Sequence, residues 1–194
     1  MRRPGTILTG VNPDGNERLT AMTGAVLIAV LAAVGVTIVW IGQLLWLHLF
    51  LGLLVIGPVA LKLLSTGYRF VRYYTHSVAY RRKGPPHPLL RGLAPLVVLS
   101  TVAVLATGVV LLFLGPSSRD PLLLLHKISF IAWVTFIAGH ILGHLPQLAR
   151  LTSRGPTGAG RGGRGGRWIA LAGALVSGSI LAIALIPQFS AWTR

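Results

Sequence analysis

The chain has 194 residues and a formal net charge of +15, because 18 lysines and arginines stand against three acidic residues. Hydrophobic residues make up 53% of the chain, charged residues only 11%, and the mean hydropathy is +0.73, which excludes an ordinary soluble domain. No cysteine is present, so disulfides, iron–sulfur clusters, thiolate-bound haem and thiol redox chemistry are excluded.

Five apolar stretches are long enough to cross a bilayer as helices, at residues 20–41, 45–68, 92–114, 121–147 and 168–187. They predict an all-α integral membrane protein, with a four-helix transmembrane bundle, arranged as a duplicated hairpin, and a fifth C-terminal transmembrane helix. The expected division of the chain is a cytoplasmic N-terminal arm at 1–19, a four-helix membrane domain at 20–150, a Gly/Arg-rich cytoplasmic linker at 151–167, and the fifth helix with an outer C-terminus at 168–194.

The cations are distributed unevenly among the loops. They gather before the first stretch, between the second and third, and between the fourth and fifth, whereas the alternate loops hold only Arg119 and Lys127. This positive-inside pattern predicts a multi-pass protein of the cell (plasma) membrane with a cytoplasmic N-terminus. The basic loops are expected to attract anionic headgroups of membrane lipid, and their placement argues against nucleic-acid binding.

The second stretch carries His48 in its first predicted turn, Gly57 and Pro58 near its middle, and Lys62 one turn later. We expect Pro58 to kink the helix, because proline removes a backbone donor and crowds the preceding turn. Lys62 is expected to extend its amine to the cytoplasmic interface, with metal ligation as the alternative.

The fourth stretch is apolar but carries His126, His140 and His144. An ionisable side chain inside a membrane span marks a functional site by default. The fourteen residues from His126 to His140 correspond to a rise of roughly 21 Å and return to within about 40° of the same helix face. That separation excludes a catalytic pair in contact, and it suits two stacked haems across a hydrocarbon core of about 30 Å.

A weak internal repeat relates the second and fourth stretches. Aligning residues 44–62 with residues 122–140 places His48 on His126 and Lys62 on His140. The apolar segments that precede them also correspond, which predicts a duplicated two-helix hairpin. Membrane proteins often build a binding site at the interface of such repeats.

His48 and His126 lie at the same predicted depth on helices that run in the same direction. We expect them to bind the iron of one haem b (heme b) from its two sides, the alternative being two interfacial histidines near the headgroups. Arg119 and Lys127 lie near that end, where they either pair with haem propionates or act as ordinary interfacial cations. No catalytic residue is expected.

His140 is the candidate ligand of a second, inner haem, with His144 one turn further on. The inner site has no second histidine opposite. Lys62 and Met22 lie at about that depth and could ligate, the alternatives being that the lysine extends to the interface and the methionine fills space. The pair formed by His140 and His144 has the spacing of a zinc site, but no carboxylate or cysteine accompanies it in a span.

A histidine in the second of four spans and a His-x13-His pair in the fourth resemble the b-type cytochrome membrane subunits of respiratory formate dehydrogenases and nickel–iron hydrogenases, over about residues 20–147. The resemblance implies that His48 and His126 share one haem and that His140 binds another. The family's partner for that second haem, a histidine near the start of the first helix, has no counterpart here. The resemblance also implies electron transport between a partner redox protein and the membrane quinone pool of a respiratory chain.

The sequence therefore predicts a transmembrane cytochrome b, an electron-transfer subunit of a membrane oxidoreductase. The alternative is a cofactor-free membrane scaffold, assembly factor or transporter subunit, in which the histidines are interfacial or handle protons. A histidine-lined metal permease is disfavoured, because no carboxylate lies in a span.

Overall fold

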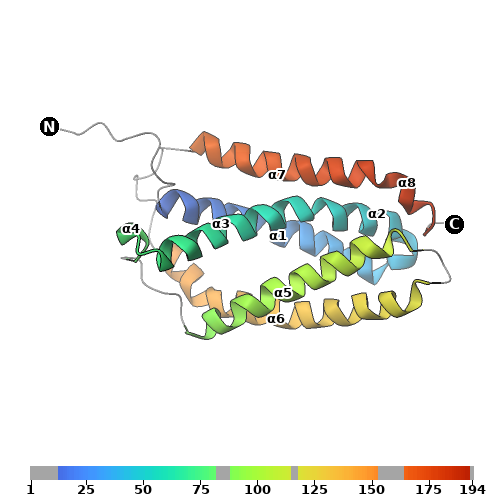
Figure 1. Cartoon of the computed structure of the whole chain (residues 1–194), viewed down its shortest axis with the longest axis horizontal. Coiled ribbons are helices and arrows are strands. Elements are labelled where there is room, and N and C mark those ends of the chain that lie inside the picture. The colour runs from blue at the N-terminus through green and yellow to red at the C-terminus, as the bar shows by residue number, and fades with distance from the viewer. Residues whose placement is uncertain (1–12, 82–87, 115–117, 153–163, 193–194) are drawn as a thin grey trace.

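The computed structural model of the chain describes residues 13–81, 88–114, 118–152 and 164–192, with only the backbone for Pro88 and residues 144–152. These residues form helices joined by turns, without a strand among them. Figure 1 shows their order, which is α1 (Pro13–Val39), α2 (Ile41–Leu54), α3 (Ile56–Tyr74), α4 (Val78–Arg81), α5 (Pro88–Leu111), α6 (Asp120–Thr152), α7 (Arg164–Ala184) and α8 (Ile186–Phe189).

Within the described part of the chain, five helical segments are long and apolar enough to cross a membrane, namely α1, the continuous pair α2–α3, α5, α6 and α7. Large apolar side chains such as Ile28, Leu64 and Leu99 are exposed on their outer faces, as a lipid environment requires. The prediction of an all-α, multi-pass membrane protein is confirmed.

Two helix boundaries differ from the sequence prediction. α1 begins at Pro13, so residues 13–19 of the expected N-terminal arm are helical. Proline is well suited to the first position of a helix, and Asp14 places a negative charge in the first turn. α7 begins at Arg164, within the expected linker.

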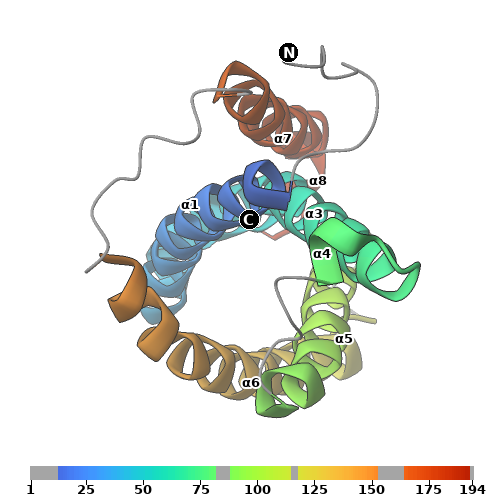
Figure 2. The ribbon, with the colours of Figure 1, turned by 90° about the vertical axis from the view of Figure 1, so that its left-hand side faces the viewer.

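The helices form two hairpins and one outer helix. α1 packs on α2 and α3, and α5 packs on α6, whereas α7 lies against α1, α2 and α3. Figure 2 looks along the bundle and shows α1, α3, α5 and α6 around a common axis, with α7 outside them. The predicted four-helix bundle with a fifth, external helix is therefore present.

The two hairpins scarcely touch each other. Among the described helices, α6 packs substantially only on α5, and α5 reaches the first hairpin mainly through α2. The bundle is therefore well packed within each hairpin and sparsely packed between them (Figure 2).

The second span is interrupted at Val55, between α2 and α3. The interruption lies just before Gly57 and Pro58, where the sequence predicted a kink. Pro58 is buried and has no N–H to offer to the carbonyl of Leu54, four residues earlier. The helix interruption thus has a local chemical cause.

The C-terminal segment closes the end of the bundle that holds the turn between α1 and α2, which we call the turn end. Phe189 of α8 is buried in a cluster with Leu53, Leu112 and Ala182. Trp46 packs edge-on against Phe189, with ring centroids 5.7 Å apart. These contacts join α8 to both hairpins, so the few contacts between the hairpins are concentrated at this end.

Candidate functional site

His48 lies in α2 at the turn end and is held by a residue of α1. Its Nδ1 is 2.9 Å from Oγ1 of Thr37, which is almost completely buried. Only Trp40 separates α1 from α2, so the last turn of one helix lies beside the first turns of the other. The tight connection therefore fixes His48 relative to Thr37.

His126 lies in α6, also at the turn end, and has the same kind of partner in the second hairpin. Its Nδ1 is 3.0 Å from Oγ1 of Thr107 on α5. The imidazole ring lies against the backbone of Gly108, where an added Cβ would stand 3.2 Å from Cε1 of the ring. Each histidine is thus placed by a threonine on the preceding helix of its own hairpin.

The two histidines also lie near each other across the bundle. His126 lies near enough to His48 for the two imidazoles to interact electrostatically. Both side chains are half-buried, and they come from hairpins that have few other contacts. The structure therefore brings together the pair that the sequence predicted to act jointly.

Lys62 lies at the interface of α1 and α3. Its Nζ donates a hydrogen bond to the backbone carbonyl of Thr20 on α1, at 2.7 Å. Gly24 makes room for the amine, because an added Cβ there would stand 3.1 Å from Nζ. The amine is thus held by α1, and its extension to the membrane surface stays a prediction.

A small polar cluster surrounds this lysine between α1 and α3. Asn16 donates through Nδ2 to the carbonyl of Ser65 at 3.0 Å, and the hydroxyl groups of Thr20 and Ser65 lie 3.1 Å apart. Asn16 and Ser65 are buried. The cluster fastens the N-terminal part of α1 to α3, at the end opposite the two histidines.

The remaining predicted ligands are dispersed. His140 is half-buried on α6, fourteen residues beyond His126, which is a rise of about 21 Å. Met22 is half-buried on α1. His144 lies in the helical backbone of α6, and its side chain is outside the described residues. The structure therefore places one predicted ligand, His140, far along α6 from the pair at the turn end.

Arg119 and Lys127, the two cations of the turn end, have different surroundings. The guanidinium of Arg119 lies over the ring of Trp192, 4.7 Å from its centroid, in a cation–π contact. Trp192 in turn donates through Nε1 to the carbonyl of Leu111 at 3.2 Å. Lys127 is exposed next to His126. Arg119 thus already has a partner within the chain.

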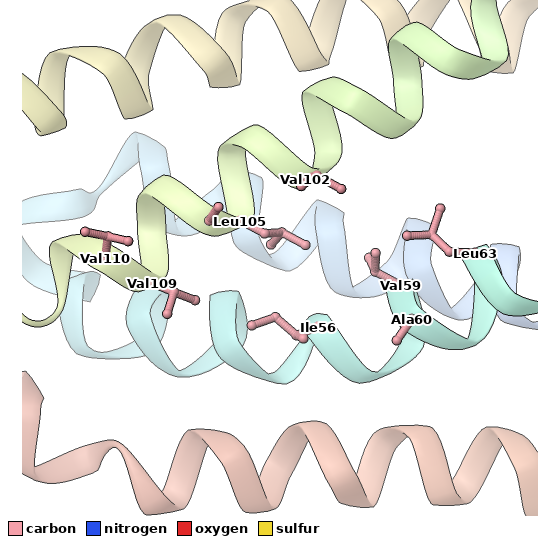
Figure 3. A pocket seen from close by; sticks show the side chains of 9 residues that line it. Ile56, Val59, Ala60, Leu63, Val102, Leu105, Val109 and Val110 are labelled. Atoms are coloured by element: carbon pink, nitrogen blue, oxygen red, sulfur yellow. The ribbon is translucent and has the colours of Figure 1, made fainter.

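An open apolar groove of about 450 Å³ lies between α3 and α5 (Figure 3). Its size falls within the range of roughly 300–1,000 Å³ that is usual for ligand pockets. Figure 3 shows aliphatic side chains lining it, among them Ile56, Leu105 and Val109. No histidine lines the groove, so it is a feature of the inter-hairpin seam that is separate from the histidine pair.

Within the residues that the structure describes, no group of three or more histidine, cysteine or acidic side chains could hold a metal ion. A haem iron has a smaller demand on the protein, because the porphyrin supplies four nitrogen ligands and the chain supplies only the axial ones. The pair of His48 and His126 meets that demand in number and in residue type.

Both threonines were missed in the sequence analysis. Thr37 precedes its histidine by 11 residues and Thr107 precedes its own by 19, because the loops that connect the two helices of each hairpin differ in length. No fixed spacing therefore relates them. The only signal was a hydroxyl residue in each apolar span that precedes a histidine.

Comparison with known protein families, with curated proteins and with solved structures finds no match to this chain. The described residues define its class as a membrane protein with five span-length helical segments, in which each of two hairpins contributes one histidine at the turn end.

Proposed function

We propose that the chain is a transmembrane b-type cytochrome in which His48 and His126 are the axial ligands of one haem b. One observation carries the proposal: the two histidines approach each other from hairpins that otherwise have few contacts. Histidine is costly inside a membrane span and needs a compensating role. Clamping an iron between the hairpins gives both side chains the same role.

The sparse packing between the two hairpins that carry the histidines would accommodate a flat, largely apolar group. Cofactor sites in helix bundles are built by side chains from facing helices, as His48 and His126 are. A haem would also supply packing contacts that the seam lacks.

Haem b, when bound, supplies reversible one-electron transfer between ferric and ferrous iron. The residues of the chain would hold and orient it. His48 and His126 would bind the iron, Gly108 would keep the imidazole of His126 close to α5, and the exposed Lys127 would be the cation available for a propionate. The protein would then act as an electron-transfer subunit between a partner redox protein and the membrane quinone pool.

A cofactor-free membrane scaffold is the second candidate, and one observation favours it. Each imidazole already has a hydrogen-bond partner within its own hairpin, Thr37 for His48 and Thr107 for His126. Histidines with such partners are stable inside a bundle without any metal. The two candidates differ in whether Nε2 of each ring binds iron.

A visible spectrum of the detergent-purified protein separates the two candidates. We expect the dithionite-reduced protein to show the sharp α and β bands of a low-spin, six-coordinate haem. His48→Ala and His126→Ala should each abolish that signal, because either change opens an axial position. His76→Asn is the matched control, since His76 is exposed after α3 with a φ of 62° that asparagine tolerates. A colourless protein from cells with ample haem would eliminate the cytochrome and favour the scaffold.

A further inference from the structure

The hydroxyl proton of Thr37 has a fixed destination. Its Oγ1 lies 2.6 Å from the carbonyl oxygen of Val34 and 2.9 Å from Nδ1 of His48. A threonine hydroxyl has one proton to donate and can also accept. The contact with Val34 is short for an O–H···O hydrogen bond, and two oxygens at that distance would repel each other without a proton between them. The proton therefore goes to Val34, and Oγ1 must accept from Nδ1–H of His48.

The threonine of the second hairpin also gives its hydroxyl proton to a backbone carbonyl. Oγ1 of Thr107 lies 2.8 Å from the carbonyl oxygen of Ala103, which takes the hydroxyl proton, and 3.0 Å from Nδ1 of His126. Oγ1 again accepts from Nδ1–H, and the backbone carbonyl of Val104 is a second acceptor near this ring. Two hairpins with connecting loops of different length thus arrive at the same contact between Nδ1 and a threonine hydroxyl oxygen.

From this pattern we infer that Thr37 and Thr107 are positioning residues, which hold His48 and His126 in the tautomer that carries its proton on Nδ1. The ring nitrogen left with a lone pair is then Nε2 in both residues. Since Nε2 is the nitrogen required for an axial bond to haem iron, this inference rests on the proposed function. It adds that two hydroxyl groups fix the tautomer of both histidines before a haem binds.

With a haem bound, the threonines would also act on the iron through the ring. A hydrogen bond accepted from Nδ1–H fixes the orientation of the imidazole and makes Nε2 a stronger base. A stronger base stabilises ferric iron more than ferrous iron and lowers the midpoint potential. Loss of the acceptor should therefore raise the potential and weaken haem binding, by about 10- to 100-fold if these hydrogen bonds resemble other partners of metal-bound histidines.

Conservative variants of the full-length protein test the inference. Thr37→Val and Thr107→Val keep the branched shape and remove the acceptor, whereas Thr37→Ser and Thr107→Ser retain a hydroxyl. Thr135→Val is the matched control, because Thr135 lies on α6 and donates its hydroxyl proton to the carbonyl of Ile131 on the same helix. We expect a positive shift of the midpoint potential and faster haem loss in both valine variants, and values near wild type in the serine variants and the control. A wild-type potential and haem affinity in both valine variants would overturn the inference and leave the proposed cytochrome intact.

A second measurement needs no haem. Nitrogen-15 NMR of histidine-labelled apoprotein distinguishes the two neutral tautomers, and the chain has six histidines in all. We expect His48 and His126 to carry the proton on Nδ1, and each to lose that preference when its own threonine becomes valine. Signals of His48 and His126 with the proton on Nε2 in the wild type would refute the assignment. If the protein is colourless but shows the Nδ1–H tautomer, the positioning role stands and the cytochrome proposal fails.

Discussion

Gly178 of α7 lies against the backbone carbonyl of Leu54, the last residue of α2, so closely that a methyl group at position 178 would collide with it. The relationship is reciprocal, because a methyl group at Gly57 would collide with the carbonyl of Ala174 on α7. Pro58 leaves the Leu54 carbonyl without its usual helical partner. The outer helix therefore crosses the second span at its interruption, where two glycines allow the backbones to meet.

The first prediction is that Gly178→Ala destabilises the protein. Overpacking in a close contact typically costs about 1–3 kcal/mol, and in a chain of this size each kcal/mol lowers Tm by about 2–4 °C. Gly173→Ala is the control, because Gly173 lies on the same helix with nothing near the added methyl group. Thermal unfolding in detergent, followed by circular dichroism, measures both. Equal Tm values for the two variants would contradict the close crossing.

The general architecture was predictable from the sequence, whereas these contacts were not. Five apolar stretches and the matched His48 and His126 follow from composition and spacing. The role of Gly178 does not, because a chain with 24 glycines gives no sign of which one meets another backbone. Thr37 and Thr107 also escaped detection, since loop length and helix rotation decide which hydroxyl group faces a histidine.

The second prediction concerns the hydrogen bond between Lys62 and the carbonyl of Thr20. Lys62→Met keeps the length of the side chain and removes the donor. We expect a loss of about 1 kcal/mol, since polar contacts between membrane helices are modest, and a fall in Tm of about 2–4 °C. The haem-to-protein ratio should not change.

Arg69→Met is the control for that experiment, because Arg69 is an exposed cation on the same helix, α3, and no stabilising contact is expected to be lost. Thermal unfolding and haem content are measured on both variants. A fall of one haem per chain in Lys62→Met, with Arg69→Met unaffected, would show that Lys62 is an iron ligand and refute a purely structural role.

The third prediction is the sidedness of the chain. The distribution of the loop cations predicts a cytoplasmic N-terminus. A reporter fused after Arg81, between α4 and α5, should report the cytoplasm, and one fused after Ser118, between α5 and α6, should report the outer side. Phosphatase and fluorescent-protein reporters give opposite signals on the two sides. An outer-side signal after Arg81 would reverse the orientation and place His48 and His126 at the cytoplasmic face.

The last prediction is the number of haems. The turn end holds two histidines from two hairpins, whereas the deeper position on α6 has His140, the first span contains no histidine, and the amine of Lys62 is hydrogen-bonded to Thr20. We therefore expect one haem per chain by pyridine haemochrome titration against protein concentration. The ratio should stay near one in His140→Ala and fall to near zero in His48→Ala. A ratio near two that drops to one in His140→Ala, with the spectrum of the remaining haem unchanged, would establish a second inner haem, and Lys62→Met and Met22→Leu would then identify its other ligand.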